Sequence, residues 1–269
     1  MNSKYFMVDV YPEVSHLFKD NSGGTDIIFD WHQIIIPQGA CMIKSFSGTI
    51  HGIDGATGND DDIRVYFAKG IDGKAPASFG TVHAVSTATT SAPFRRNLLN
   101  HLQIDMSSMD NGDVLVGYNI FGSRSAVAQD TVPDGAWNGI MLQGDTVPFL
   151  GDTNYIAPGP GFTSIWISVS AVGAVFNFGT EVNLNMAESA NVAADTTGAS
   201  VVLTTSDTDP RLVFQAGDKI IGETGGPKMV VVSVDGATQI TVKNITEQID
   251  HAEQLLLHTP ISFRIGLEY

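Results

Sequence analysis

Residues 42–53 read MIKSFSGTIHGI, a run in which the side chains alternate in character. One side of an extended chain here carries the larger apolar residues Met42, Phe46 and Ile50, and the other carries Ile43 with mostly Ser, Thr and His. A period of two is typical of a strand that is buried on one face. After an acidic turn, residues 63–68 alternate in the same way, so the two segments are predicted to form a hairpin with a long connection.

The same alternation recurs along most of the chain. It is found in residues 113–122, 162–173, 181–186 and 260–269, and turn-forming Gly and Pro residues separate these runs. The pattern predicts an all-β fold of antiparallel strands in two layers.

One segment has helical spacing instead. In residues 92–104, APFRRNLLNHLQI, the side chains of Phe94, Leu98, Leu99 and Leu102 would share one face of a helix. Pro93 stands near a suitable start position. We therefore predict one short helix packed on a β body.

The amino-acid composition of the sequence changes near Ala187. Residues 187–200 are small and polar, and short strands at close spacing follow, with tight turns predicted at Gly217-Asp218 and Asp235-Gly236. The last strand, 260–269, resembles the strands before Ala187 more than those of this segment. We infer that residues 187–259 are a small β module inserted into a large domain made of residues 1–186 and 260–269.

Composition limits the classes of partner. The chain has 269 residues and a formal charge of −15, which would repel a phosphate backbone, so nucleic acid is not expected as a direct partner. Only 16% of residues are charged, so the protein either buries surface against partners or carries neutral polar loops, and the first option fits an assembly subunit. Neither a secretory signal nor a membrane span is expected. Cys41 is the single cysteine, so no internal disulfide can form.

The acidic segment Asp60-Asp61-Asp62 raises the question of a metal site. Neighbouring side chains on an extended chain diverge, so these three carboxylates cannot all reach one ion. A calcium site using Asp60 and Asp62, together with Asp54 or backbone carbonyls, stays open as an alternative. The preferred interpretation is a solvated turn, since Asp and Asn tolerate turn geometry.

Changing Asp60, Asp61 and Asp62 together to Asn should therefore leave the melting temperature nearly unchanged in the presence of calcium. Thermal unfolding with and without calcium measures this. A large loss of stability seen only in the presence of calcium would support the calcium site, because an ion that binds only the folded state stabilises that state.

No other residues form a recognisable catalytic or ligand motif, so the sequence predicts no catalytic, cofactor-binding or metal-binding residue. The histidines are scattered without a metal-ligand spacing, at positions 16, 32, 51, 83, 101, 251 and 258. Cys41 has no signature of an activated thiol. Asn244-Ile-Thr matches a glycosylation acceptor but is interpreted as a strand end. Trp31, Trp137 and Trp166 could line a sugar-binding face, although tryptophan at such places more often anchors a core edge or a subunit contact.

Two stretches resemble a known family. IIIPQGACMIKSFSGTIHGID followed by DDDIRVYFAKGIDGKAPASFGTVHA resembles the β-rich virion structural proteins of tailed bacteriophages, in which a strand ends in an FAK-like turn before a P-x-S-[LF]-G loop. AGDKIIGETGGPKMVVVSVDGATQITV is similar to the small β-barrels of phage head and tail proteins. The resemblance implies a jelly-roll-like antiparallel β-sandwich with a small inserted β-barrel.

The resemblance also implies a function without enzymatic activity. We expect a capsid decoration, or cement, protein on the outside of the head, assembled in the host cytoplasm, with copies of itself in a trimer and the major capsid protein as partners. Two alternatives stay open. One is a tail, baseplate or fibre component that contacts the host, and the other is a soluble carbohydrate-binding β-sandwich or hydrolase.

Overall fold

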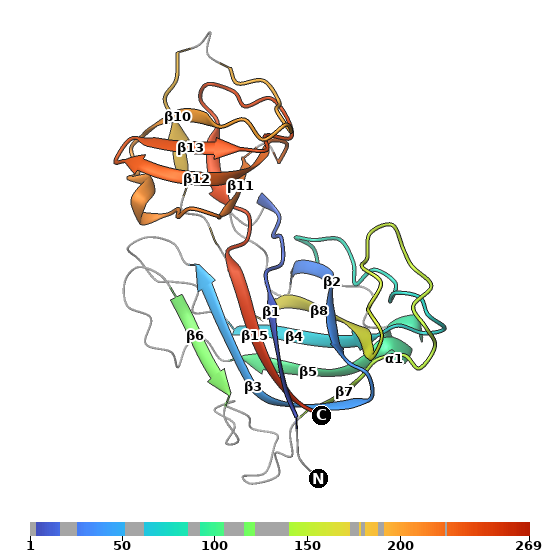
Figure 1. Ribbon diagram of the computed structural model, residues 1–269. Coiled ribbons are helices and arrows are strands. Elements are labelled where there is room, and N and C mark those ends of the chain that lie inside the picture. The colour runs from blue at the N-terminus through green and yellow to red at the C-terminus, as the bar shows by residue number, and fades with distance from the viewer. Residues whose placement is uncertain are drawn as a thin grey trace.

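The computed structural model describes residues 4–16, 26–51, 62–85, 92–104, 116–121, 140–172, 178, 181–187, 191–223 and 225–269. A β-sandwich and a smaller β-barrel make up these residues (Figure 1). The strands of the sandwich are β1 (Tyr5–Val10), β2 (Ile27–Pro37), β3 (Ala40–His51), β4 (Asp62–Lys69), β5 (Leu98–Ile104), β6 (Val116–Phe121), β7 (Met141–Gln143), β8 (Phe162–Val172) and β15 (Ile261–Glu268).

The order of the strands identifies the sandwich as a jelly roll. One sheet has the order β1-β15-β3-β6, with the short β7 also paired to β3, and the other has the order β2-β8-β4-β5. All of these pairs are antiparallel. Counted along the chain without β7, strands 1, 8, 3 and 6 therefore face strands 2, 7, 4 and 5, the arrangement of two interlocked Greek keys. The predicted all-β, jelly-roll-like fold is confirmed.

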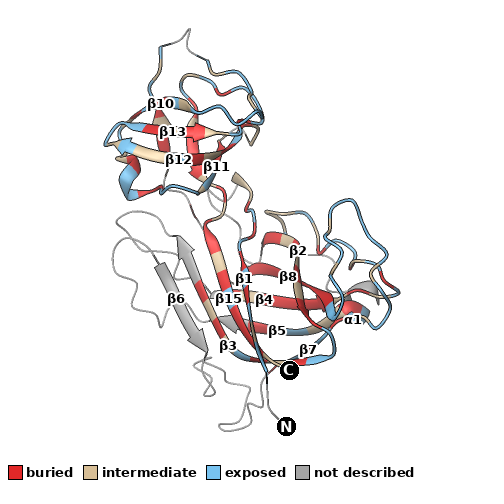
Figure 2. Ribbon diagram, in the orientation of Figure 1, coloured by how far each residue is buried: buried red, intermediate tan, exposed pale blue. Residues whose placement is uncertain are grey.

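The core lies between the two sheets, and the period-two pattern supplies it. Ile261, Phe263, Ile265 and Leu267 of β15 all point inward and are buried, as the alternation predicted. Ile63, Val65 and Phe67 of β4 meet them from the opposite sheet. β8 departs from a one-sided pattern, because Trp166 on its other face is also buried, in a second cluster with Trp31, Tyr66 and Phe79. Figure 2 shows buried residues along the sandwich strands and, separately, in the barrel.

Two expectations for residues 42–68 are wrong. β3 and β4 do not pair as a hairpin, since they belong to opposite sheets and connect one layer to the other. The alternation of β3 is also interrupted, because the register of its pairing with β15 shifts between Gly266 and Leu267. The extra residue is Lys44, and it lets both Ile43 and Phe46 point into the core, although a strict period of two places them on opposite faces.

The helix predicted for residues 92–104 is only half present. The helix α1 covers Ala92–Asn97, and the chain then continues as strand β5, which pairs with β4 along its length. The spacing of Leu98, Leu99 and Leu102 fits a helix and a bulged strand equally well, and this pairing has a register shift between Phe67 and Ala68. Hydrogen bonds to β4 and burial of Leu102 in the core outweigh local propensity here.

The barrel is closed by six strands in the order β10-β13-β12-β11-β14-β9. Their bounds are β9 (Val182–Leu184), β10 (Val201–Ser206), β11 (Lys219–Gly222), β12 (Lys228–Gly236), β13 (Gln239–Lys243) and β14 (Gln254–Leu257), and a 3₁₀ turn, η3, spans Pro210–Leu212. It has its own apolar core, which includes Leu203, Met229 and Ile240. β12 and β13 form the hairpin predicted at Asp235-Gly236, and Gly217 has a left-handed φ of 98° at the other predicted turn.

The first barrel strand begins before the expected boundary at residue 187. β9 pairs with β10 and β14, so residues 182–184 contribute to the barrel and not to the sandwich. The sequence does not predict this boundary, because the alternation in a strand of only three residues does not show which sheet the strand joins. We keep the inserted module as a proposal and move its start to residue 181.

Deleting residues 181–259 and joining the ends with a short Gly-Ser linker should leave a folded sandwich, since the sandwich has its own core. Far-UV circular dichroism and a cooperative melting transition of the purified variant measure this. Insoluble or non-cooperative material would mean that the two parts depend on one another to fold.

Candidate assembly surface

Most of the acidic segment lies outside the described residues. Asp54, Asp60 and Asp61 fall there, and Asp62 is described only as the first residue of β4. The calcium alternative therefore stays a matter for the substitution test above.

Cys41 and His32 are buried or half-buried within strands. Cys41 is fully buried on β3, and burial raises the pKa of its thiol. His32 is half-buried on β2, where burial lowers its pKa. No three His, Cys, Asp or Glu side chains within the described ranges lie close enough together to hold a metal ion. None of the helices that the structure describes has the length and apolar character that a membrane span needs.

The two tryptophans that the structure describes, Trp31 and Trp166, do not line a sugar-binding face. Trp31 and Trp166 are buried, and the Trp31 indole N–H donates to the carbonyl oxygen of Ala77 at 2.8 Å. Trp166 is packed beneath Phe149 and Tyr155 of the loop that follows β7. Trp137 lies outside the described residues. Trp31 and Trp166 thus anchor a core edge, as the preferred interpretation of the sequence has it, and the alternative of a sugar-binding face does not apply to them.

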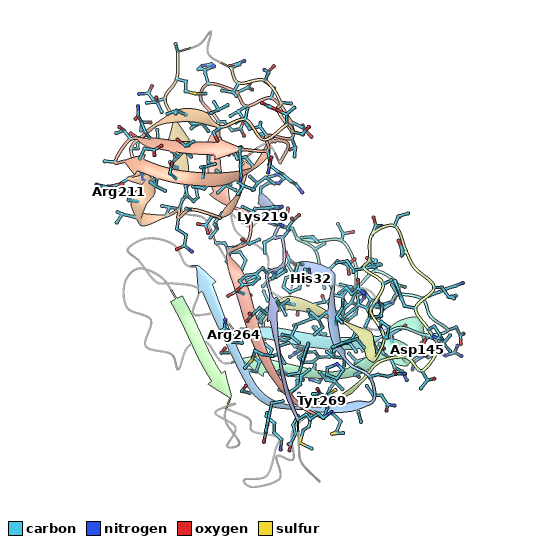
Figure 3. The ribbon with its side chains drawn as sticks, viewed as in Figure 1. His32, Asp145, Arg211, Lys219, Arg264 and Tyr269 are labelled. Atoms are coloured by element: carbon cyan, nitrogen blue, oxygen red, sulfur yellow. The ribbon has the colours of Figure 1, made fainter. Side chains whose placement is uncertain are left out.

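Glu13 joins the N-terminal segment to the barrel through Lys219, which Figure 3 labels at the base of the barrel. Its carboxylate lies 3.0 Å from Lys219 Nζ, 3.5 Å from Lys228 Nζ and 3.0 Å from His258 Nε2. Burial raises the pKa of Glu13, but the hydrogen bond from Lys219 and the positive charges of these three side chains bring it to about 2. The other ring nitrogen of His258 lies 3.0 Å from the carbonyl oxygen of Val14. These contacts, which we call the Glu13 junction, hold β11, β12 and the N-terminal segment together.

The outer face of the first sheet carries a row of large exposed side chains. Tyr5 and Glu268, Glu268 and Met42, and Met42 and Met141 are successive cross-strand neighbours over β1, β15, β3 and β7. Met7 and Asp9 continue the same outward side along β1, and the exposed Tyr11 follows directly after the strand ends at Val10. The exposed fractions are 73% for Tyr5, 54% for Met7, 57% for Tyr11 and 51% for Met141. We call this surface the β1 face.

The charges of the β1 face cancel. Arg264 Nε donates to Asp9 at 2.6 Å, and Lys44 Nζ lies 2.6 Å from Glu268. Arg264 is labelled on this sheet in Figure 3. The result is an aromatic and methionine surface without net charge, in a chain of charge −15. Tyr, Met and Arg are enriched in protein interfaces, whereas unpaired carboxylates are depleted there.

The β1 face is not among the sites predicted above, although the sequence carries a signal for it. Residues 5–11, YFMVDVY, alternate Phe6, Val8 and Val10 with Tyr5, Met7 and Asp9, and the first set faces the core. The run is short and apolar on both sides, so the pattern alone does not show which side faces solvent.

A second feature is a pocket of about 360 Å³ at the loop of residues 144–161. Asp145 fixes one end of this loop, since its carboxylate accepts from the backbone N–H groups of Gly73 (2.8 Å) and Val147 (3.1 Å). Gly73 has a φ of 72°, and a Cβ there would lie 2.4 Å from the Pro148 carbonyl oxygen, so only glycine fits. The residues that line the pocket include Asp145, Phe149, Phe162 and the three prolines Pro148, Pro158 and Pro160. The pocket is therefore built on a well-anchored loop.

Comparisons with known proteins identify no family for this chain. No family model matches the chain, and no curated protein matches it. It is similar to the crystal structure of the infectious bursal disease virus VP2 subviral particle at 7% identity and a TM-score of 0.27, over 99% of this chain and 40% of that chain. It is also similar to the crystal structure of Cucumber Necrosis Virus at 10% identity and a TM-score of 0.19, over 100% of this chain and 89% of that one. The chain thus spans less than half of the first of these proteins. The evidence for the jelly-roll fold is the strand order described above.

Proposed function

We propose that this chain is a structural protein of a virus particle, without enzymatic activity, and more specifically a decoration or cement protein on the outside of a tailed-bacteriophage head. The observation that carries the proposal is the β1 face. A row of exposed Tyr and Met side chains with paired charges, on the rigid outer sheet of a jelly roll, suits contact with other proteins.

Charge supports a position on the exterior. A net charge of −15 disfavours the inner surface of a head, where the chain would meet packaged DNA. A charged fraction of 16%, well below the usual ~25%, fits a subunit that buries much of its surface against neighbours. The proposed partners are copies of this chain, in a trimer, and the major capsid protein, with assembly in the host cytoplasm.

Immunogold labelling of intact particles tests the location. Antibodies against this chain are expected to label the outside of the head, and mass spectrometry of purified particles should detect the chain. Labelling at the tail tip would favour the baseplate or fibre alternative instead. A chain that is absent from purified particles would contradict a structural role altogether.

A second candidate function, binding of a neutral glycan, is favoured by the pocket at residues 144–161. Its volume falls within the range of small-ligand sites, and Phe149 and Phe162 offer apolar surface beside the polar Gln38 and Thr163. Titration calorimetry against a glycan panel tests it. Saturable binding that is lost in Phe162→Ala would support this function, and no heat from any glycan would exclude those tested.

A further inference from the structure

The β1 edge, by which we mean the side of β1 away from β15, presents backbone groups that no described strand uses. Lys4 and Tyr269 exchange both of their backbone hydrogen bonds, at 3.2 and 3.0 Å. Hydrogen-bonded and non-hydrogen-bonded pairs alternate along an antiparallel ladder. Counting from the hydrogen-bonded pair at Lys4, the residues Tyr5, Met7 and Asp9 each form a non-hydrogen-bonded pair with their partner on β15. Their N–H and C=O groups therefore point away from β15.

This edge lacks the features that normally prevent pairing between sheets. β1 contains no Lys, Pro or Gly, and its register with β15 has no shift. The two edge strands of the opposite sheet, β2 and β5, are irregular. β2 pairs with β8 through two register shifts and ends at Pro37, and β5 pairs with β4 through one. The β1 edge is straight, and its one charged residue, Asp9, is already paired with Arg264.

A second copy of β1 complements this edge when it runs antiparallel about a two-fold axis. The outward-pointing residues Tyr5, Met7, Asp9 and Tyr11 are all odd-numbered. In an antiparallel pairing of two β1 strands, an odd-numbered residue of one copy can therefore face an odd-numbered residue of the other copy and form a hydrogen-bonded pair. An axis at Asp9 would place two carboxylates directly opposite each other, which is unfavourable. An axis at Val8 pairs Tyr5 with Tyr11 and Met7 with Asp9, each twice, and aromatic cross-strand pairs are favourable.

The side chains also favour a second copy over other occupants. Two chains of charge −15 repel each other over most of their surfaces, and a locally neutral region is where they can approach. The β1 face has no net charge because its four charged side chains form the two ion pairs described above. Joining two β1 edges places the exposed Tyr and Met rows of the two copies next to each other.

We propose that β1 pairs with β1 of a second copy across a two-fold axis at Val8, so that the sheets of the two copies become one continuous sheet. A two-fold contact of this kind is isologous and closes after two copies. This contact goes beyond the proposed function. If the chain forms a trimer, the two-fold contact would link each trimer to a neighbouring trimer on the shell. It holds equally for a chain that forms only dimers.

Light scattering after size-exclusion chromatography tests the contact. Met7→Lys places a charged side chain in the contact, and Met7→Pro removes an N–H that β15 does not use, as edge strands tolerate. Both variants are expected to have half the particle mass of the wild type at the same concentration. Val202→Lys, a change at a 56% exposed strand position of the barrel, is the matched control and should leave the mass unchanged. Equal masses for the wild type and a folded Met7→Pro variant would overturn the proposal.

Cysteine cross-linking tests the register and does not depend on those variants. Facing residues of a non-hydrogen-bonded antiparallel pair have Cα atoms about 4.5 Å apart, close enough for a disulfide. Val8→Cys should therefore give a covalent dimer of twice 28.6 kDa on oxidation. Tyr11→Cys, though far more exposed, should not, because it faces Tyr5 of the other copy. Cross-linking at position 11 and not at position 8 would overturn this register, and monomers in both variants would overturn the contact. None of these outcomes depends on where the protein lies in a particle.

Discussion

Replacing Phe46 by Ala is expected to lower the free energy of unfolding by about 3–5 kcal/mol. Phe46 is fully buried on β3, between the two sheets. Its ring centre lies 6.5 Å from that of Phe67 on β4, nearly perpendicular to it, and 5.2 Å from that of Phe263 on β15. Removing the ring leaves a cavity that both sheets line, so the loss includes packing as well as transfer free energy. The melting temperature should fall by roughly 6–20 °C.

Ile156→Ala is the control for this measurement. Ile156 is 72% exposed, and its backbone contacts with Gln33 do not involve its side chain. The change should alter the free energy of unfolding by less than about 0.5 kcal/mol, as is usual for surface positions. Chemical denaturation of both variants at one pH gives the comparison. A Phe46→Ala variant as stable as Ile156→Ala would mean that the two sheets do not pack through this residue.

The sequence was sufficient to predict which residues face the core of the sandwich in regular strands. In β15, every second residue from Ile261 to Leu267 is apolar and buried, because a strand that buries mainly one face shows its period of two directly in the sequence. In β4, the same alternation identified Ile63, Val65 and Phe67 as core residues, but Tyr66 and Ala68 on the other face are buried as well. The hairpin of β12 and β13 was also predictable, since a tight turn at Asp235-Gly236 fixes its two strands as neighbours.

Pairing between distant strands could not be predicted from the same pattern. Nothing in residues 42–53 distinguishes a partner in β4 from partners in β15 and β6, because either arrangement buries the same apolar side chains. The extra residue Lys44 and the conversion of residues 98–104 into β5 depend in the same way on the neighbouring strand. These features are decided by tertiary contacts, which the period of one segment does not record.

The candidate surface was hidden for a different reason. Carboxylates, histidines and tryptophans are recognisable in a sequence as candidate site residues, whereas the β1 face consists of tyrosine and methionine side chains that matter only because they are exposed. Exposure depends on which strand lies at the edge of a sheet. That position follows from the pairing of β1 with β15 at the far end of the chain.

Acid is expected to weaken the Glu13 junction. The pKa of Glu13 is lowered from 4.5 to about 2 in the folded protein, so the folded state binds a proton less readily than the unfolded state does. A carboxyl group with a lowered pKa stabilises the fold fully above about pH 4.5, and this contribution is lost as the pH falls toward 2. Burial lowers the pKa of His258 despite the opposing charge of Glu13, so protonating it also favours unfolding. Both groups therefore act in the same direction.

Glu13→Gln should lower the free energy of unfolding at pH 7 by about 1–2 kcal/mol. The full pKa shift would correspond to more, but the Glu13 side chain is 44% exposed and water screens its interactions. The variant leaves Lys219, Lys228 and His258 facing one another without a carboxylate, whereas Glu247→Gln makes the same charge change at an exposed position of the barrel. Urea denaturation at pH 7, 4.5 and 3 should show a gap between wild type and Glu13→Gln that narrows with acid, and no such gap for Glu247→Gln. A gap that stays constant down to pH 3 would show that Glu13 contributes through packing and not through its charge.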